Sequence, residues 1–154
     1  MWFKKPKGGN NRKEIKEPEI REIHIDEMRQ AVNAYAKQLN PALSLRTIIK
    51  DNNEIDCHLL YDQLNCKPDR PFYMSKETFE IFEDPDYPRW IDQCQVACDQ
   101  YYLEKGTEPV AEDDPKRKVS IYKIKDYLRE EPPIDLYLHP HDRMVTHREP
   151  EEKK

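Results

Sequence analysis

Glycine is scarce in this chain, because only three of its 154 residues are glycine. Gly8 and Gly9 lie close to the N-terminus, and Gly106 follows a segment with helical periodicity. Dinucleotide-binding, P-loop and kinase-type loops need glycines that let the backbone approach a phosphate closely. The sequence therefore excludes these nucleotide-binding classes, and no motif in it indicates an organic cofactor.

Serine is as scarce as glycine, and long apolar runs are absent. Ser44, Ser75 and Ser120 all lack the flanking glycines of a nucleophile elbow, which excludes a serine hydrolase of that type. No segment approaches the roughly 20 apolar residues of a membrane span, and no apolar stretch follows the basic start as in a signal peptide. We therefore expect a cytoplasmic protein, whose cysteines are reduced or bind metal.

Charged residues are abundant instead. They make up 37% of the chain and hydrophobic residues 36%, against roughly 25% and 45–50% in typical globular domains. The net charge of -5 argues against nucleic-acid binding over a broad face. Residues 1–18 are basic and lack apolar periodicity, which predicts a disordered arm. Its Trp2-Phe3 pair and lysines could contact an anionic membrane or RNA, although a solvated tail is the simpler interpretation.

The rest of the chain predicts a single α+β domain at residues 19–147 and a disordered tail at residues 148–154. Its hairpins and helices do not alternate strictly, which favours a mainly antiparallel sheet with three to four helices. Apolar periodicity predicts one helix over residues 27–39, with Asp26 as its cap. A longer helix is predicted over residues 88–105, ended by Gly106.

Strand patterns are shorter and less regular. Residues 45–50 and 55–61 predict a hairpin around a turn at residues 51–54, in which Cys57 points inward. Residues 71–74 predict another strand. Ser75 then has the position of an N-cap for a brief helix that carries Phe79 and Phe82.

The C-terminal third is the most ambiguous part. Residues 119–130 fit either a helix capped by Ser120 or a strand that starts at Val119, and the helix is favoured. Alternation predicts a strand over residues 134–138, with Asp135, Tyr137 and His139 outward, and a returning strand over residues 144–147.

Three short runs carry a resemblance to a known family: Trp2-Phe3-Lys4-Lys5, Arg70-Pro71-Phe72-Tyr73-Met74-Ser75 and Tyr87-Pro88-Arg89-Trp90. Together they resemble a family of uncharacterised small cytosolic proteins of Bacillus-type bacteria. The resemblance implies a bacterial cytosolic setting, and it supplies no catalytic residues.

Cysteines and histidines are the candidate metal ligands. Cys94 and Cys98 lie one helical turn apart and could ligate one zinc ion, together with Cys57, Cys66 or His58. The same two cysteines share an apolar stripe with Ile91 and Tyr101, so packing in the core is the favoured interpretation. A disulfide between Cys94 and Cys98 is incompatible with an intact helix.

His139, His141 and His147, with Asp142, form the densest group of titratable side chains. If the returning strand brings His147 back, they could bind a divalent metal or form a pH-sensitive contact. An exposed hairpin without a role is the simpler interpretation, because exposed histidines near a polar terminus are common.

The sequence favours a non-enzymatic interaction or regulatory module, and its expected partner is another protein. Exposed charge and flexible connectors, such as the charged segment expected at residues 107–118, suit partner binding, and catalytic loops are missing. The alternative is a metal-binding protein or a metal-dependent hydrolase that uses the cysteines or the C-terminal histidines. No residue is singled out as catalytic.

Overall fold

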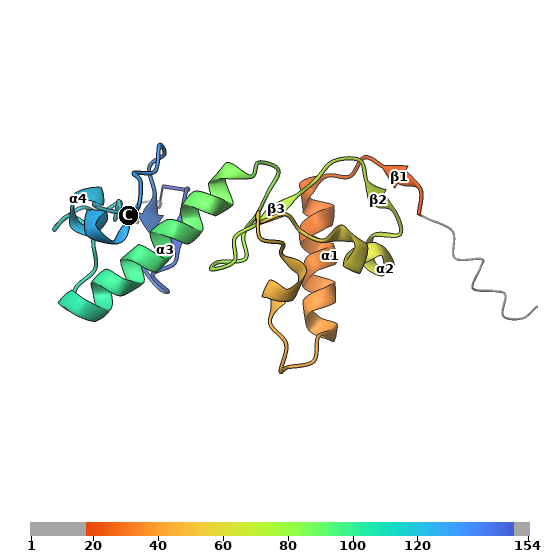
Figure 1. The fold of residues 1–154 in the computed structure, drawn as a ribbon, viewed down its shortest axis with the longest axis horizontal. Helices are drawn as coiled ribbons and strands as arrows, with labels where there is room; N and C mark the ends of the chain where they lie inside the picture. The colour runs from red at the N-terminus through yellow and green to blue at the C-terminus, as the bar shows by residue number, and fades with distance from the viewer. Residues whose placement is uncertain (1–17, 150–154) are drawn as a thin grey trace, which may run out of the picture.

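The protein has a mixed α+β fold, which Figure 1 shows as an elongated molecule with α1 and α2 towards one end and α4 at the other. The computed structural model describes residues 18–149, so the predictions for the basic arm and for residues 150–154 lie outside the described residues. The helices are α1 (Ile25–Gln38), α2 (Tyr61–Leu64), α3 (Asp86–Lys105) and α4 (Ile121–Ile124), with 3₁₀ helices η2 (Leu45–Ile48), η3 (Cys57–Leu60) and η4 (Lys125–Tyr127).

The strands form three separate two-stranded sheets rather than the one sheet that we expected. The parallel pair joins β1 (Ile20–Arg21) to β2 (Lys67–Pro68). The antiparallel pairs join β3 (Tyr73–Met74) to β4 (Ile81–Phe82), and β5 (Tyr137–Leu138) to β6 (Val145–Thr146). Within the described residues, no helix is both long enough and apolar enough to cross a membrane.

Helix α1 begins two residues earlier than the predicted start, and its cap is His24 rather than Asp26. The His24 Nδ1 atom accepts the backbone N–H of Asp26, and the Glu27 carboxylate accepts the backbone N–H of His24. This reciprocal arrangement satisfies N–H groups that the first turn leaves without partners. The predicted apolar face is confirmed, since Met28 and Val32 are buried.

The predicted hairpin over residues 45–61 is wrong. Its two runs form the 3₁₀ helices η2 and η3, and a single bridge between Ile49 and Ile55 remains of the pairing. The Ser44 hydroxyl accepts the N–H of Arg46 and thereby starts η2, which local strand propensity did not reveal. Cys57 packs against the core but stays partly exposed.

A hairpin forms instead at residues 73–82, where we expected a brief helix. The Ser75 hydroxyl does accept the N–H of Thr78, at 2.9 Å, as a cap would. The chain then reverses at Phe79, whose φ is +63°, and the N–H of Ser75 donates to the carbonyl of Glu80. The predicted cap therefore closes a turn between β3 and β4.

Helix α3 ends at Lys105 as predicted and begins at Asp86, two residues before the predicted start. It contains Pro88 in its first turn, and Gly106 ends it with a φ of +76° and an N–H bond to the carbonyl of Tyr102. Glycine suits this position because a left-handed backbone strains residues that have a Cβ atom.

In the C-terminal third, both interpretations of residues 119–130 hold in part. Ser120 caps α4, as predicted, while Val119 forms a bridge with Val110. The predicted strands correspond to β5 and β6. The prediction that Tyr137 points outward is wrong, because its side chain is buried in β5 while its backbone pairs with Thr146.

Buried side chains form two clusters rather than the one core that we expected. The N-terminal core includes Met28, Ile48 and Phe72, and the C-terminal core includes Ile91 and Leu138. The two are continuous in sequence at β4, since Ile81 belongs to the first and Phe82 to the second. That the two cores unfold together as one domain stays a prediction.

Candidate functional site: a pocket beside helix α3

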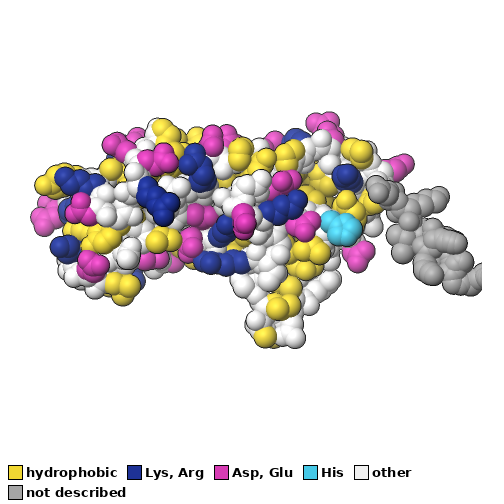
Figure 2. Space-filling model, viewed as in Figure 1, with side chains coloured by type: hydrophobic (Ala, Val, Ile, Leu, Met, Phe, Trp, Pro, Cys, Tyr) yellow, Lys and Arg dark blue, Asp and Glu magenta, His cyan; other side chains and the backbone are white. Residues whose placement is uncertain are grey.

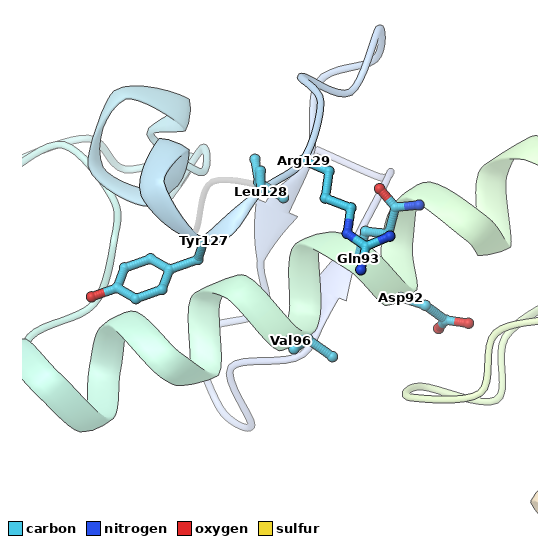
Figure 3. Close-up of a pocket in the computed structure, with 6 residues that line it drawn as sticks. All are labelled: Asp92, Gln93, Val96, Tyr127, Leu128 and Arg129. Atoms are coloured by element: carbon cyan, nitrogen blue, oxygen red, sulfur yellow. The ribbon is translucent and has the colours of Figure 1, made fainter.

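A hollow of about 350 Å³ lies between α3 and the chain that leaves η4. We call it the α3 pocket, and its lining residues, drawn in Figure 3, are Asp92, Gln93, Val96, Tyr127, Leu128 and Arg129. Its volume lies at the lower end of the roughly 300–1,000 Å³ range that is typical of ligand pockets. One wall is a regular helix, and the other is a short extended segment.

Helical geometry explains the first wall. Asp92 and Val96 are four residues apart, so their side chains lie on one side of α3, with Gln93 beside them. The second wall begins where η4 ends, because Leu128 takes an extended conformation with ψ of 142°. Its backbone N–H still donates to the carbonyl of Lys125, which closes the last turn of η4.

Tyr127 ties the two walls together. Its hydroxyl donates to the Glu104 carboxylate of α3 at 2.5 Å, and its ring meets the ring of Tyr101 edge-on at 6.5 Å. The hydrogen bond to Glu104 raises the pKa of Tyr127 to about 12. The phenol therefore stays protonated at neutral pH and cannot act as a base there.

The remaining lining side chains are free to meet a ligand. Val96 is 48% exposed although it is apolar, and Leu128 is half-buried beside it. In the part of the chain that the structure describes, neither Gln93 nor Arg129 has a hydrogen-bond or ion-pair partner. Figure 3 shows the Arg129 guanidinium and the Gln93 carboxamide side by side in this view, with Tyr127 extending in the opposite direction.

Asp92 lines the pocket, but its carboxylate already accepts four hydrogen bonds from other parts of the protein. One carboxylate oxygen accepts the Ser75 hydroxyl at 2.5 Å and the N–H of Glu77. The other accepts the Asn53 amide at 2.8 Å and the N–H of Lys76. Figure 3 shows this carboxylate directed away from Arg129. These four bonds, which we call the Asp92 clamp, join α3 to the turn between β3 and β4 and to Asn53.

The predicted burial of Cys94 and Cys98 is confirmed, since their exposed fractions are 0% and 3%. Their sulfur atoms lie 3.8 Å apart as free thiols, and the hydrogen bond between them together with burial raises the pKa of Cys98. Cys66 is buried in the other core. Among residues 18–149, no three or more histidine, cysteine, aspartate or glutamate side chains are arranged to hold a metal ion.

The structure brings two of the three candidate histidines together and leaves the third apart. The rings of His139 and His141 lie 5.4 Å apart in the exposed turn of the β5–β6 hairpin, with Asp142 beside them. His147 lies beyond the other end of β6, because Thr146 pairs with Tyr137 rather than with a residue nearer the turn. The structure therefore does not bring the three histidines together on one surface.

A family profile described as "Protein of unknown function (DUF3939)" matches residues 18–147. The chain belongs to this family. No curated protein and no solved structure matches the chain. The resemblance to a family of uncharacterised proteins is thereby confirmed. The matched segment includes both cores, the Asp92 clamp and the α3 pocket, so all of them lie within the family's domain.

Sequence reasoning missed the pocket and the clamp. Val96 carried one usable signal, because it is an apolar residue off the apolar stripe of α3 and so had to be exposed. Nothing in the order of residues indicated that Arg129 would lie against α3. That approach depends on how the segment after η4 packs.

His147 is the titratable group that the fold perturbs most clearly among the histidines. Its ring packs 5.1 Å from that of Phe82 and 5.2 Å from that of Tyr87. Its Nδ1 atom lies 3.8 Å from the Glu80 carboxylate, which Arg148 approaches at 3.0 Å. Burial lowers the pKa of His147, while Glu80 opposes this shift and Arg148 adds to it.

We expect this histidine to make the domain less stable in acid. Its native pKa lies below the ordinary value of 6.5, so near and below that pH the unfolded chain binds more protons, and the free energy of unfolding falls as pH decreases. Urea unfolding at about pH 7.5 and at about pH 5 measures this loss of unfolding free energy, which should be smaller in His147→Phe than in the wild type. His139→Gln, at an exposed site, should leave the loss unchanged. An equal loss in His147→Phe and in the wild type would contradict the assignment.

Proposed function

We propose that this protein is a non-enzymatic interaction module that binds a peptide segment of another protein in the α3 pocket. The observation that carries the proposal is the combination, in one hollow, of exposed Val96 with the unpartnered side chains of Gln93 and Arg129. A peptide needs both kinds of contact, because its side chains supply apolar area while its amides need donors and acceptors.

The charges of the pocket favour binding over catalysis. Tyr127 is protonated, with a pKa of about 12, and arginine keeps its proton at any physiological pH. The lone pairs of Asp92 are used by the clamp. The lining residues therefore include no group that is free to take or give a proton at neutral pH, which general acid–base catalysis requires.

The small size of the pocket sets the expected affinity. A single apolar anchor with a few hydrogen bonds fits dissociation constants of about 1 µM to 1 mM rather than the nanomolar range. Such a module would depend on rapid exchange or on additional contacts elsewhere.

The test is selection of peptides from a random display library by the wild-type chain, followed by affinity measurements on Val96→Asp. This variant should bind the selected peptides at least about 10-fold more weakly, because it places a charge where an apolar side chain docks. Leu103→Asp is the matched control, since Leu103 is 81% exposed on α3 and lies outside the pocket.

Both variants should keep the wild-type circular dichroism spectrum, because both positions are exposed. Failure of the wild type to enrich any peptide would contradict the proposal. So would equal affinities for Val96→Asp and Leu103→Asp.

A further inference from the structure

We infer that Arg129 selects the partner: the peptide that occupies the α3 pocket carries a carboxylate next to its apolar side chain. This inference rests on the proposed function and adds the chemistry of the ligand. It starts from the arginine itself, whose guanidinium borders the pocket and is exposed.

Arg129 differs from the other arginines that the structure describes. Arg143 stacks on the ring of Tyr102, with its guanidinium carbon 4.0 Å from the ring centre. The others each lie within ion-pair distance of an acidic side chain: Arg21, Arg29, Arg46, Arg70, Arg89, Arg117 and Arg148. Within residues 18–149, Arg129 is the one arginine that has neither an acidic nor an aromatic partner.

A free guanidinium beside a pocket matches a carboxylate in shape and in charge. Its planar fork can donate two parallel N–H bonds to the two oxygens of a carboxylate. The neighbouring Gln93 carboxamide adds a further donor on the same side of the hollow. Asp92 does not compete for Arg129, because its carboxylate is held in the clamp.

The two acidic residues that follow Arg129 in the chain do not bind its guanidinium in place of a ligand. Glu130 and Glu131 are exposed, do not line the pocket and make no ion pair with Arg129. As solvated charges their effect on the pocket is screened by salt. Val96 and Leu128 then place the apolar part of the ligand beside the carboxylate, which gives the expected sequence of an apolar residue next to Asp or Glu.

The experiment uses three pools of acetylated and amidated synthetic peptides with the same random flanks. Each pool contains a fixed leucine followed by Glu, by Gln or by Lys, and binding is measured by fluorescence anisotropy. The wild type should bind the Glu pool about 10-fold more tightly than the Gln pool, and the preference should weaken as salt increases. Arg129→Glu should reverse the order and favour the Lys pool.

Lys105→Glu is the matched control, because it reverses an exposed charge in the last turn of α3, outside the pocket. It should keep the preference for the Glu pool. Equal binding of the three pools by the wild type, with binding still lost in Val96→Asp, would overturn the role of Arg129 and leave the proposed function standing. Binding that Val96→Asp does not weaken, or no binding of any pool, would contradict both.

Discussion

Replacement of Asp92 by alanine is expected to lower the free energy of unfolding by about 3 kcal/mol, because several donors lose their acceptor at once. Ser75 is fully buried and Asn53 nearly so, and the N–H groups of Lys76 and Glu77 also point at this carboxylate. A buried donor without a partner costs about 1–3 kcal/mol, and water that enters from the pocket side would recover part of the total.

Urea unfolding followed by circular dichroism measures this effect. Asp99→Ala is the matched control, since Asp99 is an exposed aspartate of the same helix that accepts one bond, from Gln95. It should change stability by no more than about 0.5 kcal/mol. Asp92→Asn keeps one acceptor oxygen and should give an intermediate loss. If Asp92→Ala were as stable as Asp99→Ala, the clamp would have no energetic role.

The second large effect is expected from the two cores. Phe72→Ala in the N-terminal core and Leu138→Ala in the C-terminal core should each cost about 3 kcal/mol or more, because both side chains are buried and the cavities left behind collapse only in part. If residues 19–147 form one domain, as the sequence predicts, each variant lowers the stability of the whole chain. Two features would couple the cores: the Asp92 clamp, and strand β4, which contributes one residue to each core.

Hydrogen exchange separates this outcome from independent unfolding. One cooperative unit predicts that Phe72→Ala lowers the protection of the most slowly exchanging amides in α1 and in α3 by the same free energy. Loss of protection in α1 alone, with α3 unchanged, would show that the two cores are separate domains.

Features with short-range causes were predictable from the sequence. Helix α3 was predicted correctly at its end and to within two residues at its start, because Pro88 favours a first turn, Gly106 favours a left-handed end, and the apolar stripe between them has the helical period. The same stripe placed Cys94 and Cys98 in the core. The start of α1 was off by two residues because histidine caps helices less often than aspartate.

Features with long-range causes were not predictable. The run at residues 45–61 has strand-like composition, but Asn53 turns inward with a φ of +73° and its amide bonds to Asp92, which is 39 residues away. Ser75 was recognised as a cap, yet its hydroxyl also donates to Asp92, so the chain turns instead of continuing as a helix. Tertiary contacts of this kind override local propensity.

The same distinction between short-range and long-range causes applies to the candidate site residues. The burial of the cysteines follows from helical period, whereas the separation of His147 from His139 follows from the register of β5 and β6. The α3 pocket depends on the packing of the segment after η4, within residues 119–130, where the sequence left helix and strand open. No sequence motif marks its lining residues, and they form a site only because the fold brings them together.

The most direct test of the binding proposal is chemical-shift mapping by NMR, with a peptide that the wild-type chain selects added to the isotopically labelled protein. The proposal predicts that the largest shifts fall on the lining residues of the α3 pocket, including the side-chain signals of Gln93, Val96 and Arg129. Shifts that fall elsewhere on the protein, with these signals unchanged, would contradict it.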